Sequence, residues 1–143
     1  MIKIKLKRTI KGKDYIKEME EEHGSVEELK QIFKDGKGDM KLELDLEDWE
    51  YFLDNPEEDL EQTRIIYDET PHFTISDLQI LDQIKNNEIE SISDLAKQLN
   101  KDVSVITRNV NKLKEKGFIV LKEGQVNNMK TPVFNYDTIE IAI

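Results

Sequence analysis

Residues 91–119 read SISDLAKQLNKDVSVITRNVNKLKEKGFI, and they decide the fold of the second half of the chain. Two short helical patterns lie in this stretch, separated by the polar break at 100–102. In the first pattern, a serine (Ser91 or Ser93) can cap a helix. Its apolar residues recur at helical spacing, namely Leu95, Ala96 and Leu99. Asn100 tolerates a left-handed backbone, and an Asp can cap the next helix, so the break predicts a tight turn.

The second pattern predicts a helix from about 103 to 116 with one buried stripe. Its apolar residues recur at intervals of three and four, namely Val103, Ile106, Val110 and Leu113. Gly117 provides a stop for the helix, and the apolar run at 118–121 begins a strand. Helix, short turn, helix and strand follow one another as in a winged helix-turn-helix domain.

The opposite face of this second helix carries side chains that match the edges of DNA bases. A major groove offers acceptors at guanine, donor–acceptor pairs at adenine and the methyl group of thymine. Arg, Asn, Ser or Thr and a small apolar group are complementary to those edges. The predicted base-reading residues are Ser104, Val105, Thr107, Arg108 and Asn111. The alternative is a solvated polar face, but solvated faces elsewhere in this chain are rich in Glu and Asp.

A second set of residues is predicted to hold the DNA backbone. Lys101 and Lys112 lie at the turn and on the helix, where an ammonium group can contact phosphate. Two strands around a polar loop at about 122–131 would form the wing, which can contact the backbone or a minor groove. The predicted wing contacts are Lys122, Asn127, Asn128 and Lys130.

The charge of the chain is distributed unevenly. The 143 residues include 21 basic and 31 acidic side chains, which gives a net charge of -10. Residues 1–70 carry 12 basic and 21 acidic side chains, whereas 71–143 carry 9 and 10. The window 97–130 has 8 basic and 3 acidic residues and is therefore net positive. We expect a local basic surface within an acidic protein.

Residues 1–70 predict a small acidic α+β region. Residues 1–8 and 40–46 alternate apolar and charged side chains, which predicts two half-buried strands. Ser25-Val-Glu-Glu28 is a capping-box pattern that opens a helix. Residues 57–69 are compatible with a helix or a strand. With residues 71–143 as the winged helix-turn-helix domain, the predicted fold class is α+β.

Both ends of residues 71–143 carry informative patterns. Thr74 can cap a helix with Asp77 as its reciprocal partner, and Phe73 can pack on Leu78. Residues 136–143 alternate isoleucine with other residues, and such a strand needs a partner in this chain or in a second copy. A homodimer is expected, because reading two half-sites requires two recognition helices.

Composition argues against several classes of function. The chain has no cysteine, so disulfides, thiolate ligands and cysteine nucleophiles are excluded. His23 and His72 lie in no ligand pattern such as HExxH, so no metal site is expected. The glycine-containing loops DGKGD and EGQ lack a phosphate-loop frame, so no cofactor and no enzyme activity are expected either. No apolar run approaches the roughly 20 residues of a membrane helix. The N-terminus lacks the apolar core of a secretory signal, so a cytoplasmic location is expected.

Residues 91–119 resemble the helix-turn-helix core of MarR-like winged-helix transcriptional regulators. The matching frame is S-D-L-A-x-x-L-N-x-D-V-x-x-I-x-R-x-V-x-x-L-x-x-x-G-F-I. Residues from about 74 to 143 are similar to a narrower group, the small predicted DNA-binding regulators of archaea and bacteria. The shared features are the Asp102-Val103 helix start and the terminal Tyr136-Asp-x-Ile-Glu-Ile141. The resemblance implies groove-facing positions for Thr107, Arg108 and Asn111.

Two functions are compatible with these patterns. The first is a sequence-specific regulator of transcription that binds double-stranded DNA through the helix at about 103–116. The alternative is a protein-interaction module, such as an antitoxin that neutralises a partner through the acidic residues 1–70. Some relatives in the narrower group resemble antitoxins or autoregulators encoded beside a partner protein, and both roles can coexist in one chain.

Overall fold

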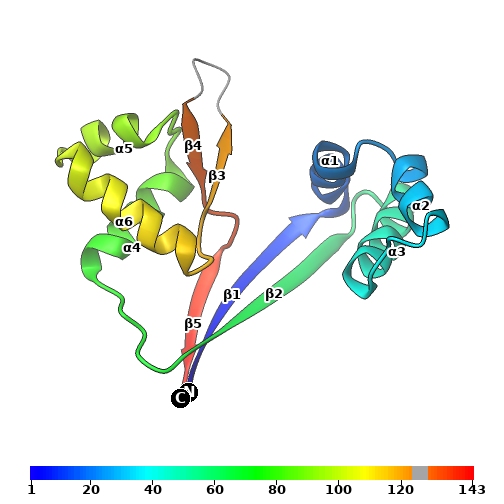
Figure 1. Cartoon of the computed structure of the whole chain (residues 1–143), viewed down its shortest axis with the longest axis horizontal. Helices are drawn as coiled ribbons and strands as arrows, with labels where there is room; N and C mark the ends of the chain where they lie inside the picture. Colours follow the sequence, from blue (N-terminus) through cyan, green and yellow to red (C-terminus); the bar gives the residue numbers. More distant parts are fainter. Residues whose placement is uncertain (124–128) are drawn as a thin grey trace. The chain divides into compact units, whose positions relative to one another are not determined.

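The computed structural model describes residues 1–123 and 129–143, and over these residues the chain is a mixed α+β protein (Figure 1). Its strands form a three-stranded sheet in the order β2-β1-β5 and a two-stranded sheet of β3 and β4. The six helices and five strands of the described residues are β1 (Ile2–Lys11), α1 (Gly12–His23), α2 (Val26–Lys34), α3 (Met40–Asp54), β2 (Asp59–Asp68), α4 (Ile75–Asn86), α5 (Ile92–Leu99), α6 (Val103–Glu115), β3 (Val120–Glu123), β4 (Lys130–Val133) and β5 (Thr138–Ala142).

The chain divides into two compact units at positions other than the predicted boundary at residue 70. The terminal unit comprises Met1–Lys7 and Thr63–Ile143, and the inserted unit comprises Arg8–Gln62. β1 explains the difference, because its residues 3–7 pair antiparallel with 138–142 of β5. The first part of β1, residues 2–7, therefore belongs with the second half of the chain.

Helices α4, α5 and α6 supply most of the core of the terminal unit (Figure 1). The predicted capping box of α4 is confirmed: the Asp77 N–H donates to Thr74 Oγ1 at 3.2 Å, and the Thr74 N–H donates to Asp77 Oδ2 at 3.1 Å. The predicted packing of Phe73 on Leu78 stays a prediction. Leu78 is 50% exposed, and the ring of Phe73 lies 4.7 Å from that of Phe118. The inward face of α4 is formed instead by Asp77, Ile80, Leu81 and Ile84.

The tight turn between α5 and α6 forms as the sequence predicts. Asn100 ends α5 in the left-handed conformation, with φ of 53°, and Asp102 caps α6 by accepting a hydrogen bond from the Ser104 N–H at 2.8 Å. Beyond α6, Gly117 adopts φ of 88°, which favours glycine. A Cβ atom there would lie 2.8 Å from a guanidinium nitrogen of Arg64, whose Nη1 donates to the Gly117 carbonyl at 3.1 Å.

The predicted strand at the end of the chain forms as β5 and finds a partner in the same chain. Ile139 pairs with Leu6, and Ile141 pairs with Ile4, so these isoleucines share the apolar face of the sheet. On the other face, Lys7 Nζ lies 2.6 Å from a carboxylate oxygen of Glu140.

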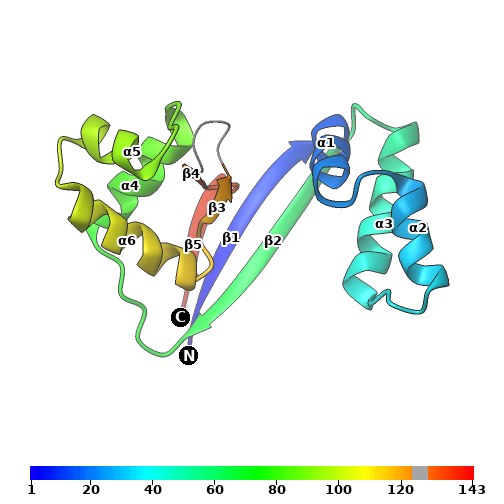
Figure 2. The ribbon, with the colours of Figure 1, turned by 45° about the horizontal axis from the view of Figure 1, so that its top comes forward.

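The inserted unit contains α1, α2 and α3, which gather around a separate core (Figure 2). Its buried side chains are Tyr15, Met19, Leu29, Trp49 and Phe52. Ser25 caps α2 by accepting from the Glu28 N–H at 3.1 Å, as predicted. The prediction of a strand at 40–46 is wrong, because these residues form the first half of α3, capped by Asp39. Residues 59–68, which were ambiguous, form β2.

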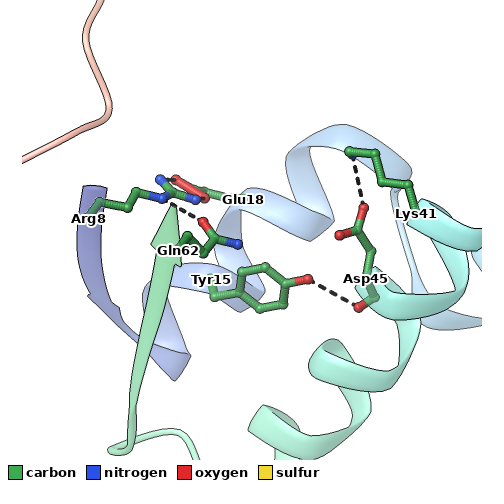
Figure 3. A network of polar contacts seen from close by, with 6 residues as sticks. All are labelled: Arg8, Tyr15, Glu18, Lys41, Asp45 and Gln62. Atoms are coloured by element: carbon green, nitrogen blue, oxygen red, sulfur yellow. Dashed lines mark hydrogen bonds and ion pairs between the residues drawn. The ribbon is translucent and has the colours of Figure 1, made fainter. Parts of the chain in front are cut away.

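Polar contacts hold the first and last residues of the inserted unit together (Figure 3). The Arg8 guanidinium donates to both carboxylate oxygens of Glu18, at 2.8 and 2.7 Å, and its Nε donates to Gln62 at 2.7 Å. The hydroxyl of Tyr15 donates to the Asp45 carbonyl at 3.1 Å. Burial raises the pKa of Tyr15, and the nearby carboxylates of Asp45 and Asp48 act in the same direction.

Candidate nucleic-acid interface

Helix α6 has a buried face and an exposed face. Ile106, Val110 and Leu113 are buried in the core of the terminal unit. The positions 104, 108, 111 and 115 are separated by four, three and four residues, so they lie together on the opposite side of the helix. All four side chains at these positions are exposed. The burial of one side fixes which residues α6 can present to a ligand.

Arg108 and Asn111 are the most available of the predicted base-reading residues. Both are exposed, and neither side chain makes a hydrogen bond or an ion pair with any other described residue. The guanidinium matches the two acceptors of guanine, and the carboxamide matches the donor and acceptor of adenine. The structure places these two groups on one face, three residues apart on the same helix.

Ser104 and Thr107 use their hydroxyl groups locally. The Ser104 hydroxyl donates to an oxygen of the Asp102 carboxylate at 2.6 Å, and that of Thr107 donates to the Val103 carbonyl at 2.7 Å. Each oxygen keeps a lone pair that can accept a hydrogen bond. Hydrogen bonds from the Ser104 hydroxyl and N–H lower the pKa of Asp102, so an ionised carboxylate caps the N-terminus of α6.

The exposed side of α6 includes two residues that the sequence interpretation did not place there. Val103, assigned to the buried stripe, is 47% exposed, because it is the first residue of α6 and lies beyond the core. Together with Val105, also exposed, it adds apolar surface at the start of the helix. Sequence reasoning missed Glu115, which shares the face of Arg108 and Asn111. The same spacing of three and four that defines this face could have identified it.

Lys112 is bound within the protein. Its Nζ donates to Asp77 Oδ2 at 2.8 Å, which connects α6 to the capping box of α4. Asp77 is fully buried, and its Oδ1 has no hydrogen-bond partner among the described residues. Burial acts to raise the pKa of Asp77, but the hydrogen bonds from Lys112 and Thr74 outweigh it, so the pKa is lowered. In this structure the ammonium of Lys112 forms an ion pair that joins α6 to α4.

The other residues predicted to contact the DNA backbone lie on separate elements of the terminal unit. Lys101 is exposed in the turn and lines a groove of about 380 Å³ together with side chains of α4 and α6. In the β3–β4 sheet, Lys122 pairs with Thr131, and Glu123 pairs with Lys130. Because neighbouring residues of a strand point to opposite faces, Lys122 and Lys130 lie on different faces. The predicted contacts at 127 and 128 lie outside the described residues.

The β3–β4 sheet is attached to the helices by its second strand. The hydroxyl of Thr131 donates to the Glu90 carbonyl, in the segment between α4 and α5, at 2.7 Å. Pro132, the next residue, is buried. The position of β4 relative to α4 and α5 is therefore fixed by a hydrogen bond and by packing.

The described residues contain no candidate for a metal site and none for a membrane-spanning helix. Across residues 1–123 and 129–143, no three His, Asp or Glu side chains are grouped so that they could hold a metal ion. Over the same residues, no helix has the length and apolar character needed to cross a membrane.

Comparison with known proteins links the terminal unit to one family. The family model HVO_A0114 matches residues 72–141, which is 70 of the 143 residues of the chain. The match begins before α4, ends in β5 and includes none of the inserted unit. Neither the search of curated proteins nor the search of solved structures found a match.

Proposed function

We propose that residues 71–143 form a winged helix-turn-helix domain that binds double-stranded DNA sequence-specifically, and that the protein regulates transcription. The observation that carries the proposal is the pair Arg108 and Asn111, which are exposed and without partners among the described residues on a helix whose other side is buried. A recognition helix needs both features, because burial sets its orientation and free polar groups read base edges.

Under this proposal the predicted contacts have different roles. Arg108 and Asn111 would read bases by donating and accepting in the major groove, and Val105 would contact a thymine methyl group. Ser104 and Thr107 would accept hydrogen bonds through oxygens that already donate locally. Lys101 and one lysine of the β3–β4 sheet would hold phosphates. Glu115 would accept from a cytosine amino group or exclude other bases from its position.

The proposal is tested by selecting duplexes from a randomised pool with the full chain. Sequence-specific binding predicts that a shared motif is enriched and that its affinity exceeds that of a scrambled duplex about 10³-fold or more. Fluorescence anisotropy at low and near-physiological salt then measures both affinities. A pool that shows no common motif after repeated rounds, with equal binding to all duplexes, would contradict sequence-specific recognition.

Arg108→Ala sharpens this test at one residue. We expect a loss of about 1–3 kcal/mol in binding to the selected motif and a relaxed preference at one base pair. Lys17→Ala is the matched control, because Lys17 is an exposed cation of the inserted unit and its loss changes the net charge equally. If the substitution weakens binding to the motif and to the scrambled duplex equally, Arg108 contacts phosphates and does not read a base.

A second function is favoured by the charge of the inserted unit. Arg8–Gln62 forms its own core and carries 19 acidic and 8 basic side chains. A surface of this kind suits a basic protein partner, as an antitoxin would need. The test measures binding of the full chain to the protein encoded beside it. Replacement of Glu20, Glu21 and Glu22 by glutamine is expected to weaken binding, whereas unchanged affinity would exclude this surface.

A further inference from the structure

β5 is an edge strand whose outer side is open. It lies at one end of the β2-β1-β5 sheet, and no strand of the described residues pairs with its other edge. Soluble proteins commonly protect such edges with lysine, proline or a bulge. The sequence of β5, TIEIA at 138–142, contains neither lysine nor proline, and its one charged side chain, Glu140, forms an ion pair with Lys7 of β1. An unprotected edge of this kind can add a strand from another chain.

The apolar face of the sheet is incompletely covered along β5. Ile139 is partly buried against the core of the terminal unit, whereas Ile141 is 58% exposed and Ile143 is fully exposed. Ile141 pairs with Ile4, which is buried, so the two side chains lie on the same face of the sheet. Met1, which precedes β1, is also exposed. An open strand edge and an exposed apolar patch therefore coincide at β5.

We propose that β5 pairs antiparallel with β5 of a second copy of this chain, with Ile141 on the two-fold axis. In this register Ile139 faces the partner's Ile143, the two Ile141 side chains face each other, and Glu140 faces the partner's Ala142. A register centred on Glu140 would place two carboxylates directly opposite each other, which is unfavourable. The pairing is isologous, as closed dimers require, and extends the sheet to six strands.

This dimer does not rest on the proposed binding of DNA, and salt distinguishes the two. Each chain has a net charge of -10, so two copies repel each other at low ionic strength. Raising the salt concentration screens this repulsion and should strengthen the dimer. The same change should weaken binding to DNA, because the release of counterions from DNA gains less free energy when the surrounding solution is more concentrated in salt.

Sedimentation of the full chain over a concentration series tests the proposal without DNA. We expect a monomer–dimer equilibrium and, for Ile141→Lys, a dissociation constant at least about ten-fold higher, because each dimer loses the apolar contact between its two Ile141 side chains and gains two facing charges. Ile65→Lys is the matched control: Ile65 is 44% exposed on β2 of the same sheet and lies outside the proposed interface. A monomer at all concentrations, or equal effects of the two substitutions, would overturn the proposal.

Single cysteines test the register, because the natural chain has none. Cross-strand neighbours have Cβ atoms about 4.5–5.5 Å apart, close enough for a disulfide after small adjustments. Ile141→Cys should therefore cross-link to a covalent dimer under mild oxidation, and an equal mixture of Ile139→Cys and Ile143→Cys should do so faster than either alone. Cross-linking of Ile65→Cys as fast as Ile141→Cys would show random collision and refute the register.

Discussion

The two units of this chain differ in charge and in the size of their cores. The inserted unit has 8 basic and 19 acidic residues, a net charge of -11, and five buried apolar residues. The terminal unit has 13 basic and 12 acidic residues, a net charge of +1, and a core of thirteen buried residues among those that the structure describes. The acidity that argues against a DNA-binding protein therefore belongs to the unit without α6. The net charge of a whole chain is a poor guide to the surface of one unit.

The largest effects are expected from substitutions that test whether the two cores are independent. Phe52 lies in the core of the inserted unit and Leu113 in that of the terminal unit, and the two cores share no buried residue. Phe52→Ala should cost about 3–5 kcal/mol and Leu113→Ala about 2–5 kcal/mol, each in its own unit. Trp49, the single tryptophan, is buried beside Phe52 and reports on the inserted unit by fluorescence.

Denaturant unfolding followed by fluorescence and by circular dichroism separates the two outcomes. Phe52→Ala should shift the Trp49 transition to lower denaturant. Leu113→Ala should leave that transition in place while part of the helical signal is lost earlier. If both substitutions shift the Trp49 transition equally, the two units unfold together in one cooperative transition, and their cores are not independent.

Most of the helix boundaries of the terminal unit follow from local sequence signals. Thr74, Ser91 and Asp102 accept hydrogen bonds from the first turns of α4, α5 and α6, and Asn100 and Gly117 adopt the backbone conformations that their residue types favour. These signals act over three or four residues, so one sequence is sufficient to read them. The ion pair of Lys112 with Asp77 joins residues 35 positions apart, and no local pattern indicates it.

The inserted unit shows where such reasoning fails. Residues 40–46 alternate as a strand would, but Met40 and Leu44 are exposed on a helix. The apolar stripe of α3 emerges only over a longer window, through Leu42, Leu46, Trp49 and Phe52. Leu, Met, Glu and Lys also favour helices, whereas the segment contains no β-branched residue. Propensity and a longer window would have corrected the prediction.

Lys112→Met should have an intermediate effect, confined to the terminal unit. The substitution keeps the length of the side chain but leaves the buried carboxylate of Asp77 without its charged donor. We expect a loss of about 1.5–3 kcal/mol in the free energy of unfolding. Urea unfolding followed by circular dichroism measures the loss. Lys114→Met is the control, since Lys114 is exposed on the same helix, and an equal effect there would refute a role for the ion pair.

The same ion pair should make stability depend on pH. The pKa of Asp77 is lower in the folded protein than its ordinary value near 4, so its ionised form stabilises the fold above that value. This contribution is lost as the pH falls through the lowered pKa. The difference in unfolding free energy between the wild type and Asp77→Asn should therefore shrink as the solution becomes more acidic than about pH 4. A difference that is constant with pH would show that Asp77 acts only through its shape.

The smallest effect is expected at Asn100, where the backbone between α5 and α6 is left-handed. An alanine Cβ is disfavoured in this conformation, so Asn100→Ala should destabilise the terminal unit by about 1 kcal/mol, whereas Asn100→Gly should be close to neutral. Thermal unfolding of the three proteins gives this order directly. If glycine is as harmful as alanine, the amide of Asn100 contributes more than its tolerance of the left-handed region. Equal stability of all three would mean that the turn relaxes, and α6 would then owe its position to its core residues and Lys112 alone.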